Sequence, residues 1–229
     1  MKRRLTLLTM ILYPLLTFAQ FTGTVSDSQG VKYTANDDES TCYVSGHETS
    51  YSATITIPEV YEGRYVTSIG ENAFNQCVRL TSIEIPSSVT SIGESAFNYC
   101  ICLTSIEIPS SVTSIGNSAF PACAFTSITI PNGVTSIGKS VFESCRGLTS
   151  ITIPESVTSI GDRAFSICTG LTSITIPESV MMIGECSFSD CISLTSITIP
   201  KGVTSIGERA FSDCSALTSI IVEKDNVLY

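Results

Sequence analysis

The chain has 229 residues, with 12 basic and 21 acidic side chains, a formal net charge of −9 and ten cysteines. The length allows one or two domains. The acidic balance argues against binding to nucleic acid and against simple attraction to anionic membranes.

The first residues are typical of a secretory leader. Basic residues at positions 2–4 precede an apolar stretch over residues 5–18, and small residues surround a cleavage point near Ala19. We therefore expect a signal peptide over residues 1–19 and a secreted or cell-surface mature chain with a formal net charge of −12. The same stretch is of marginal length for an uncleaved anchor. The sequence predicts no transmembrane segment in the mature chain.

Residues 20–54 predict a β-rich N-terminal cap. Short strands are expected at 31–34 and 41–44, and a third at 50–57 leads into the repeats. A cap is needed because the first unit of a stacked array would otherwise expose its apolar core and a strand edge. An insertion over 59–65 predicts a hairpin-like extension with two Tyr and one Arg. These residue types are enriched at interfaces, and packing on the cap is the alternative.

Residues 55–229 consist of successive copies of one sequence motif, which predicts a solenoid of about seven coils plus a partial terminal coil. The step is 23 residues, except for 22 between Leu103 and Phe125. A stretched forerunner covers residues 55–77. Later copies begin at Leu80, Leu103, Phe125, Leu148, Leu171, Leu194 and, in part, Leu217.

A single unit, Leu80 to Cys102, predicts the path of one coil. Apolar residues alternate with polar ones from 82 to 85, as in a half-buried strand, and Pro86 ends that strand. A second extended piece follows and ends at Gly93. Apolar residues at 96, 97 and 100 fit one side of a short helical arc. We therefore predict an α/β solenoid with a parallel β-sheet and short helical or 3-10 arcs.

Two repeat positions predict columns in the core. One column is Phe74, Phe97, Phe120, Phe142, Phe165, Phe188 and Phe211, and the other is Cys77, Cys100, Cys123, Cys145, Cys168, Cys191 and Cys214. The even cysteine count is compatible with disulfides. A ladder of buried free thiols is favoured, because in-register side chains meet disulfide geometry poorly. Cys42, Cys102 and Cys186 lie out of register.

The sequence supplies no parts for catalysis. His47 is the one histidine and accompanies no nucleophile motif, and glycines follow the coil rather than a phosphate-binding loop. No C-x-x-C pair exists to hold a metal. We therefore predict a protein that is not an enzyme and has no catalytic, cofactor-binding or metal-binding residues.

The pattern L-x-x-I-x-I-P-x-x-V-x-x-I-G-x-x-A-F-x-x-C closely resembles the BspA-type (treponemal-type) bacterial surface leucine-rich repeats. It covers about three-quarters of the chain. The resemblance implies a right-handed coil with the parallel sheet on its concave side. It also implies a secreted or cell-surface binding role, often adhesion to extracellular matrix proteins such as fibronectin and fibrinogen.

The outward positions of that sheet are the predicted partner-binding residues. They are Ser82, Glu84, Ser105, Glu107, Ser127, Thr129, Ser150, Thr152, Ser173, Thr175, Ser196 and Thr198. Hydroxyl side chains also suit a strand that merely faces solvent, so both readings stay open. Two other functions compete with protein binding. One is a structural spacer or a solenoid that self-associates through its C-terminal edge; the other is glycan binding, which the lack of Trp disfavours.

Overall fold

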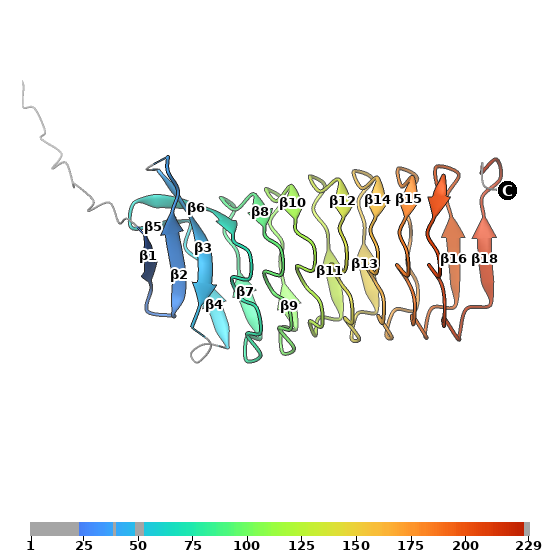
Figure 1. Ribbon diagram of the computed structural model, residues 1–229, viewed down its shortest axis with the longest axis horizontal. Helices are drawn as coiled ribbons and strands as arrows, with labels where there is room; N and C mark the ends of the chain where they lie inside the picture. The colour runs from blue at the N-terminus through green and yellow to red at the C-terminus, as the bar shows by residue number, and fades with distance from the viewer. Residues whose placement is uncertain (1–22, 39, 49–52, 227–229) are drawn as a thin grey trace, which may run out of the picture.

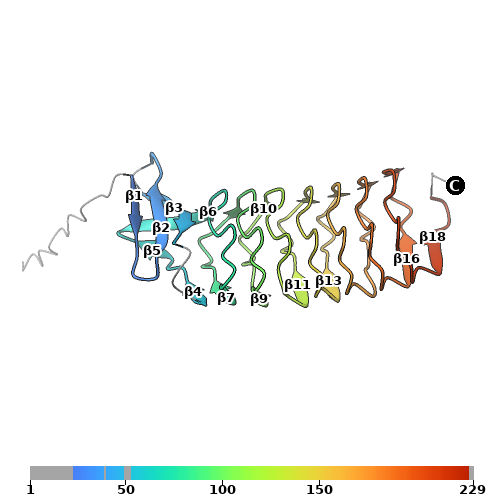
Figure 2. The ribbon, with the colours of Figure 1, turned by 60° about the horizontal axis from the view of Figure 1, so that its bottom comes forward.

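The computed structural model describes residues 23–38, 40–48 and 53–226. In these residues the chain forms a rod of about eight coils, which runs nearly straight in both views (Figures 1 and 2). The predicted leader lies outside the described residues. Coil 1 ends at residue 79, and coils 2 to 8 begin at Leu80, Leu103, Phe125, Leu148, Leu171, Leu194 and Leu217.

An antiparallel sheet closes the N-terminal end of the rod (Figure 1). Strand β2 (Val31–Ala35) pairs with β1 (Thr24–Ser26) on one side and with β3 (Thr41–His47) on the other. β3 then runs parallel to β6 (Arg64–Ile69) of coil 1. The cap thus continues a strand row of the solenoid and covers the edge of β6. β2 and β3 lie where strands are predicted, whereas β1 does not follow from the sequence pattern.

The insertion in coil 1 is a hairpin that packs on the cap. Strand β5 (Val60–Tyr61) pairs antiparallel with the start of β6. The ring of Tyr61 stacks on that of Tyr33, with 4.0 Å between ring centroids, and Arg64 is buried. Tyr65 alone of the three predicted interface residues is exposed, at 54%. Packing on the cap therefore accounts for Tyr61 and Arg64.

Each coil contributes to two rows of parallel strands. The first strand row is β4 (Thr54–Thr56), β7 (Ser82–Glu84), β9 (Ser105–Ile106), β11 (Ser127–Thr129), β13 (Ser150–Thr152), β16 (Ser196–Ile199) and β18 (Ser219–Val222). The second is β6, β8 (Ser91–Ile92), β10 (Ser114–Ile115), β12 (Ser136–Ile137), β14 (Ser159–Ile160), β15 (Met182–Ile183) and β17 (Ser205–Ile206). Paired strands are in register, so Ser127 lies beside Ser150. In coil 6 residues 173–176 form no strand.

The predicted helical or 3-10 arcs are wrong, because the described residues contain no helix. Two residues of each arc have left-handed backbone, for example Ser95 with φ 54° and Tyr99 with φ 57°, and a helix cannot continue through them. The amides of Ser95, Phe97 and Tyr99 donate to carbonyls of the next coil at 2.8–3.0 Å. The arc is a series of turns whose alternate amides bond between coils rather than along the chain.

Aromatic rings and thiols fill the core as columns. Consecutive Phe rings of the predicted column stack with centroids 5.2–5.8 Å apart. All ten cysteines are free thiols, and the seven of the predicted column are buried. From coil 2 onward each thiol donates to the carbonyl of the preceding coil's Phe, as Cys145 Sγ does to Phe120 O at 3.1 Å. Most of these carbonyls also accept the amide of the cysteine in their own coil, as Phe142 O does from Cys145 N at 3.2 Å, so the thiol is a second donor that links two coils.

The boundary between coils 3 and 4 interrupts both strand rows. β9 does not pair with β11, and β10 does not pair with β12. No other boundary among the described coils breaks the second row, and the missing strand of coil 6 affects only the first. Coil 3 is the 22-residue unit, and the residue that it lacks is missing from the loop between Cys123 and Phe125, at this boundary. The widest spacing in the Phe column, 5.8 Å between Phe120 and Phe142, lies here too.

Phe125 fills the space that this break opens. It replaces the leucine that begins every other full copy. Its ring meets Phe120 and Phe142 edge-on, with centroids 6.1 Å and 6.4 Å away, and is fully buried. The apolar core therefore remains continuous across a boundary where the strands do not bond.

Candidate functional site

The twelve predicted partner-binding residues lie along the first strand row and its continuations. Eleven are exposed, and Ser82 is half-buried. Ser173 and Thr175 lie in the segment of coil 6 that forms no strand, and Glu107 follows the end of β9. We call this surface, defined by those twelve residues, the strand face.

Most strand-face side chains are not engaged within the described protein. Ser82 Oγ donates to Thr54 Oγ1 at 3.2 Å, and Glu84 Oε2 accepts from Thr56 Oγ1 at 3.1 Å. The other ten make no side-chain hydrogen bond to a described residue. Threonines just before the strands differ, since Thr149 Oγ1 donates to the Thr126 carbonyl at 3.0 Å. Ten of the twelve side chains therefore keep their polar groups free of side-chain hydrogen bonds among the described residues.

Two hollows indent the strand face and meet at Glu107. The first, of about 310 Å³, is lined by Ile83, Glu84, Ile85, Ser87, Glu107 and Pro109. The second, of about 440 Å³, crosses the break and is lined by Ile106, Glu107, Ile108, Ser127, Ile128 and Thr129. Apolar side chains line both hollows, and Glu84 and Glu107 are their charged groups. This arrangement suits a cationic side chain with an apolar stem.

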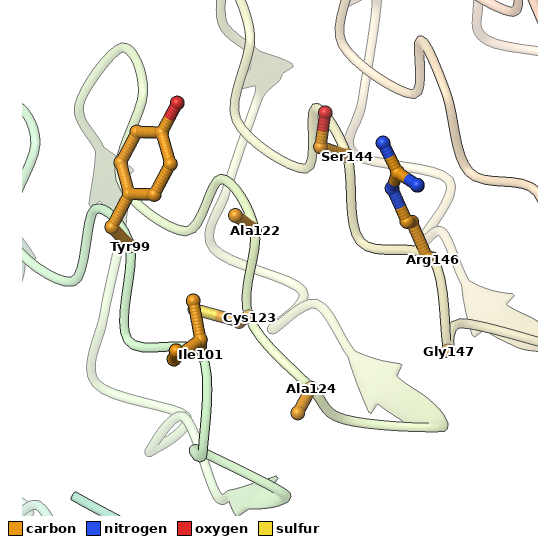
Figure 3. Close-up of a pocket in the computed structure, with 8 residues that line it drawn as sticks. All are labelled: Tyr99, Ile101, Ala122, Cys123, Ala124, Ser144, Arg146 and Gly147. Carbon is orange, nitrogen blue, oxygen red and sulfur yellow. The ribbon is translucent and has the colours of Figure 1, made fainter. Parts of the chain in front are cut away.

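A third hollow opens at the same break, at the loops that precede the first strands. It measures about 470 Å³ and is lined by Tyr99, Ile101, Ala122, Cys123, Ala124, Ser144, Arg146 and Gly147. Figure 3 shows Tyr99 and Ile101 on one side, Ser144 and Arg146 on the other, and the small residues of coil 3 between them. We call it the notch. The prediction of binding residues missed it, although the 22-residue step was its signal in the sequence.

A smaller hollow lies on the arcs of the later coils, where the repeat varies. Arg163, Cys186 and Arg209 occupy the same position in coils 5, 6 and 7 and help to line about 250 Å³. The acidic groups Glu143, Asp190 and Asp213 line it as well. Because basic and acidic side chains line it together, the charge of this hollow favours neither an anionic nor a cationic ligand.

His47 and Cys77 are in contact, but their environment is that of a core. The Sγ of Cys77 lies 3.6 Å from Nδ1 of His47, and the imidazole packs near the Phe74 ring. Burial raises the pKa of Cys77 to about 11 and lowers the pKa of His47. A reactive cysteine has a lowered pKa and is accessible, whereas Cys77 is 5% exposed. This pair caps the thiol column at its first coil.

The described residues show neither a metal-binding cluster nor a membrane-spanning helix. Residues 23–38, 40–48 and 53–226 contain no group of three or more His, Cys, Asp or Glu side chains placed to hold a metal ion. None of the segments described forms a helix long and apolar enough to span a membrane.

Comparison with known proteins identifies the family of the repeat. The model of the BspA type leucine rich repeat region matches residues 67–169 and 135–228, in six copies. No curated protein matches the chain.

Solved structures show the same architecture. One similar structure is the leucine-rich repeat protein TpLRR of T. pallidum, with 26% identity, a TM-score of 0.56 and coverage of 86% of this chain and 83% of that one. Another is a leucine rich cell surface protein of Faecalibacterium prausnitzii, with 23% identity, a TM-score of 0.51 and coverage of 88% and 95%. With the family model matching most of the solenoid, the chain belongs to the BspA-type leucine-rich repeat proteins.

Proposed function

We propose that this protein is a non-catalytic binding module, secreted or displayed at the cell surface, that recognises another protein through the strand face. The observation that carries the proposal is the row of exposed, unengaged polar side chains with two acid-lined hollows meeting at Glu107. A long shallow surface of this kind gives affinity through many contacts over a large area rather than through one deep pocket.

Extracellular matrix proteins such as fibronectin and fibrinogen are the partners we propose for an adhesin-like role. Support comes from membership of the family and from the leader-like residues 1–19. The hollows around Glu107 favour a partner segment that places Lys or Arg there, because the lining carboxylates have no basic neighbour in either hollow.

A binding panel tests the proposal. The purified protein is passed over immobilised matrix proteins and glycans at physiological salt, beside Glu84→Lys/Glu107→Lys and the control Glu185→Lys/Glu208→Lys. The control changes net charge equally, at exposed residues of the arcs. We expect binding to a matrix protein that the strand-face variant loses and the control retains. Equal binding by all three proteins, or no binding to any protein while the fold is intact, would contradict the proposal.

Self-association is a second candidate function. Ile220 and Ile221 in β18 are 48% and 53% exposed, where earlier strands carry polar residues at the outward position of Ile221, such as Thr198. Light scattering over a range of protein concentrations distinguishes the two functions: a mass that rises with concentration favours assembly, and a constant monomer mass excludes it.

A further inference from the structure

We propose that the notch binds a protein segment in which a bulky aliphatic side chain lies next to a carboxylate. The inference rests on the proposed function only in taking the ligand to be part of a protein. It assigns a second contact surface, on the loops rather than on the strand face, with the opposite charge preference to that of Glu84 and Glu107.

The notch exists because coil 3 lacks one residue. Coils 1, 2 and 4 to 7 have two residues between the column cysteine and the next first-row segment, as in Cys145-Arg146-Gly147-Leu148, whereas coil 3 has only Ala124. This loop is shorter than its neighbours, and its residues Ala122 and Ala124 have small side chains. A hollow of about 470 Å³ remains, within the usual range of about 300–1,000 Å³ for binding pockets.

Apolar side chains form one wall of the notch. Tyr99 and Ile101 are 55% and 51% exposed and lie on the coil 2 side, facing the alanine floor (Figure 3). The Cys123 residue beneath is 2% exposed, so the floor offers no reactive or polar side chain. An aliphatic side chain entering here removes water from both walls and from itself, which is the favourable contribution to binding.

Arg146 sets the charge of the ligand. It is exposed and is the one charged residue that lines the notch. Among the described residues the single ion pair joins Lys32 and Glu48, so no carboxylate of the described chain occupies the guanidinium. A guanidinium at the rim of an apolar hollow favours a carboxylate, which it can hold with two parallel hydrogen bonds. In a ligand that carries both groups, the aliphatic side chain contacts Tyr99 and Ile101 while the adjacent carboxylate binds Arg146.

The test uses the blocked peptide acetyl-Gly-Leu-Asp-amide and NMR chemical shifts of the protein. We expect saturable shifts at Ala122, Ala124 and Arg146, with a dissociation constant of about 1 mM. Acetyl-Gly-Leu-Asn-amide and acetyl-Gly-Ala-Asp-amide should each bind about tenfold more weakly, because each lacks one of the two matching groups.

Matched variants separate the notch from the loops around it. Arg146→Gln should weaken peptide binding about tenfold, whereas Arg79→Gln, at an exposed arginine in the equivalent loop of coil 1, should leave it unchanged. Ile101→Ala should weaken binding, and Ile192→Ala should not, although Ile192 has the same repeat position and is 47% exposed. All four positions are exposed loop residues, so loss of folding is not expected to confuse the result.

Two results would overturn the assignment. One is the absence of saturable shifts at ~10 mM peptide, where a complex of the expected strength is mostly formed. The other is equal binding of the aspartate and asparagine peptides, or of Arg146→Gln and the unmodified protein. Glu84→Lys/Glu107→Lys should still bind the peptide, so failure of the strand-face proposal and failure of this one are distinguishable.

Discussion

At the residue scale, the column of cysteines is explained by hydrogen bonding rather than by covalent links. A thiol is small enough for the core and donates to a carbonyl of the preceding coil, as Cys168 Sγ does to Phe142 O at 3.1 Å. An alanine would fill much of the space but would remove this hydrogen bond between coils. The sequence predicts the burial of this column, but not its acceptor, because the acceptor belongs to the neighbouring coil.

The buried thiols make stability fall in alkaline solution. Burial raises the pKa of Cys100, Cys145 and Cys191 to about 12, against 9.0 for an unperturbed thiol. Above about pH 9 the unfolded chain loses thiol protons that the folded chain keeps. The contribution of these thiols to the free energy of unfolding is therefore complete below pH 9 and falls as the pH rises towards 12. Urea midpoints measured from pH 7 to pH 11 should show this decline.

The control for that decline is Cys145→Ala/Cys191→Ala. With two thiols removed, the midpoint should fall less steeply above pH 9 than it does for the unmodified protein, although the variant starts from a lower stability. Parallel curves for the two proteins would show that lysine and tyrosine titration, rather than the thiols, controls the alkaline loss.

At the element scale, the strands follow from the sequence and the arcs do not. Alternation around Ile83 predicts a strand because a strand's side-chain period is a local property. The spacing of Ala96, Phe97 and Cys100 fits one turn of helix equally well as a set of turns. Hydrogen bonds to the next coil decide between them, for example Phe97 N to Ala119 O at 2.8 Å, and such bonds are absent from a single unit.

The candidate site likewise has one part that the sequence predicts, the strand face, and one part that it does not, the notch. The outward position of the strand-face residues is predictable, because it depends only on alternation along each strand. The notch depends on how three successive loops differ in length, and on small side chains at Ala122 and Ala124 that matter only when longer neighbours stand on both sides. A comparison of whole coils, rather than of repeat positions, is needed to find it.

The repeated glycine of the second row gives an element-scale prediction. A Cβ added at Gly161 would lie 2.7 Å from the backbone carbon of Gly138 in the preceding coil, whereas at Gly138 its nearest neighbour is the side-chain oxygen Asn117 Oδ1. Backbone cannot give way, but an exposed asparagine can turn aside. Gly161→Ala should therefore lower the free energy of unfolding by about 2–3 kcal/mol and Gly138→Ala by about 1 kcal/mol or less.

Urea unfolding of the two variants measures the difference. Both alanines enter the same repeat position and have the same helix and strand propensity, so the pair isolates the effect of the neighbouring coil. An equal loss in the two proteins would mean that the boundary between coils 3 and 4 is packed as tightly as the others.

At the scale of the whole molecule, the rod consists of two stacks of coils joined at one irregular boundary. Coils 1–3 continue the cap, and coils 4–8 form the rest (Figure 1). Across the boundary the arcs still bond, as Phe120 N does to Val141 O at 3.0 Å, and Phe125 keeps the core continuous. Both the notch and the larger strand-face hollow open at this boundary. One missing residue thus gives an otherwise uniform repeat the irregular surface on which the proposed specific binding depends.

Insertion of one glycine between Ala124 and Phe125 tests this account most directly, because it restores the 23-residue step and changes no side chain. Hydrogen exchange should first show slower amides in β9 to β12, as the two strand rows close.

The decisive measurement is then the affinity of this protein for the matrix protein and for the Leu-Asp peptide that the unmodified chain binds. We predict at least a tenfold loss of both affinities, with stability equal or higher. Unchanged affinities in a protein whose strand rows have closed would contradict the account.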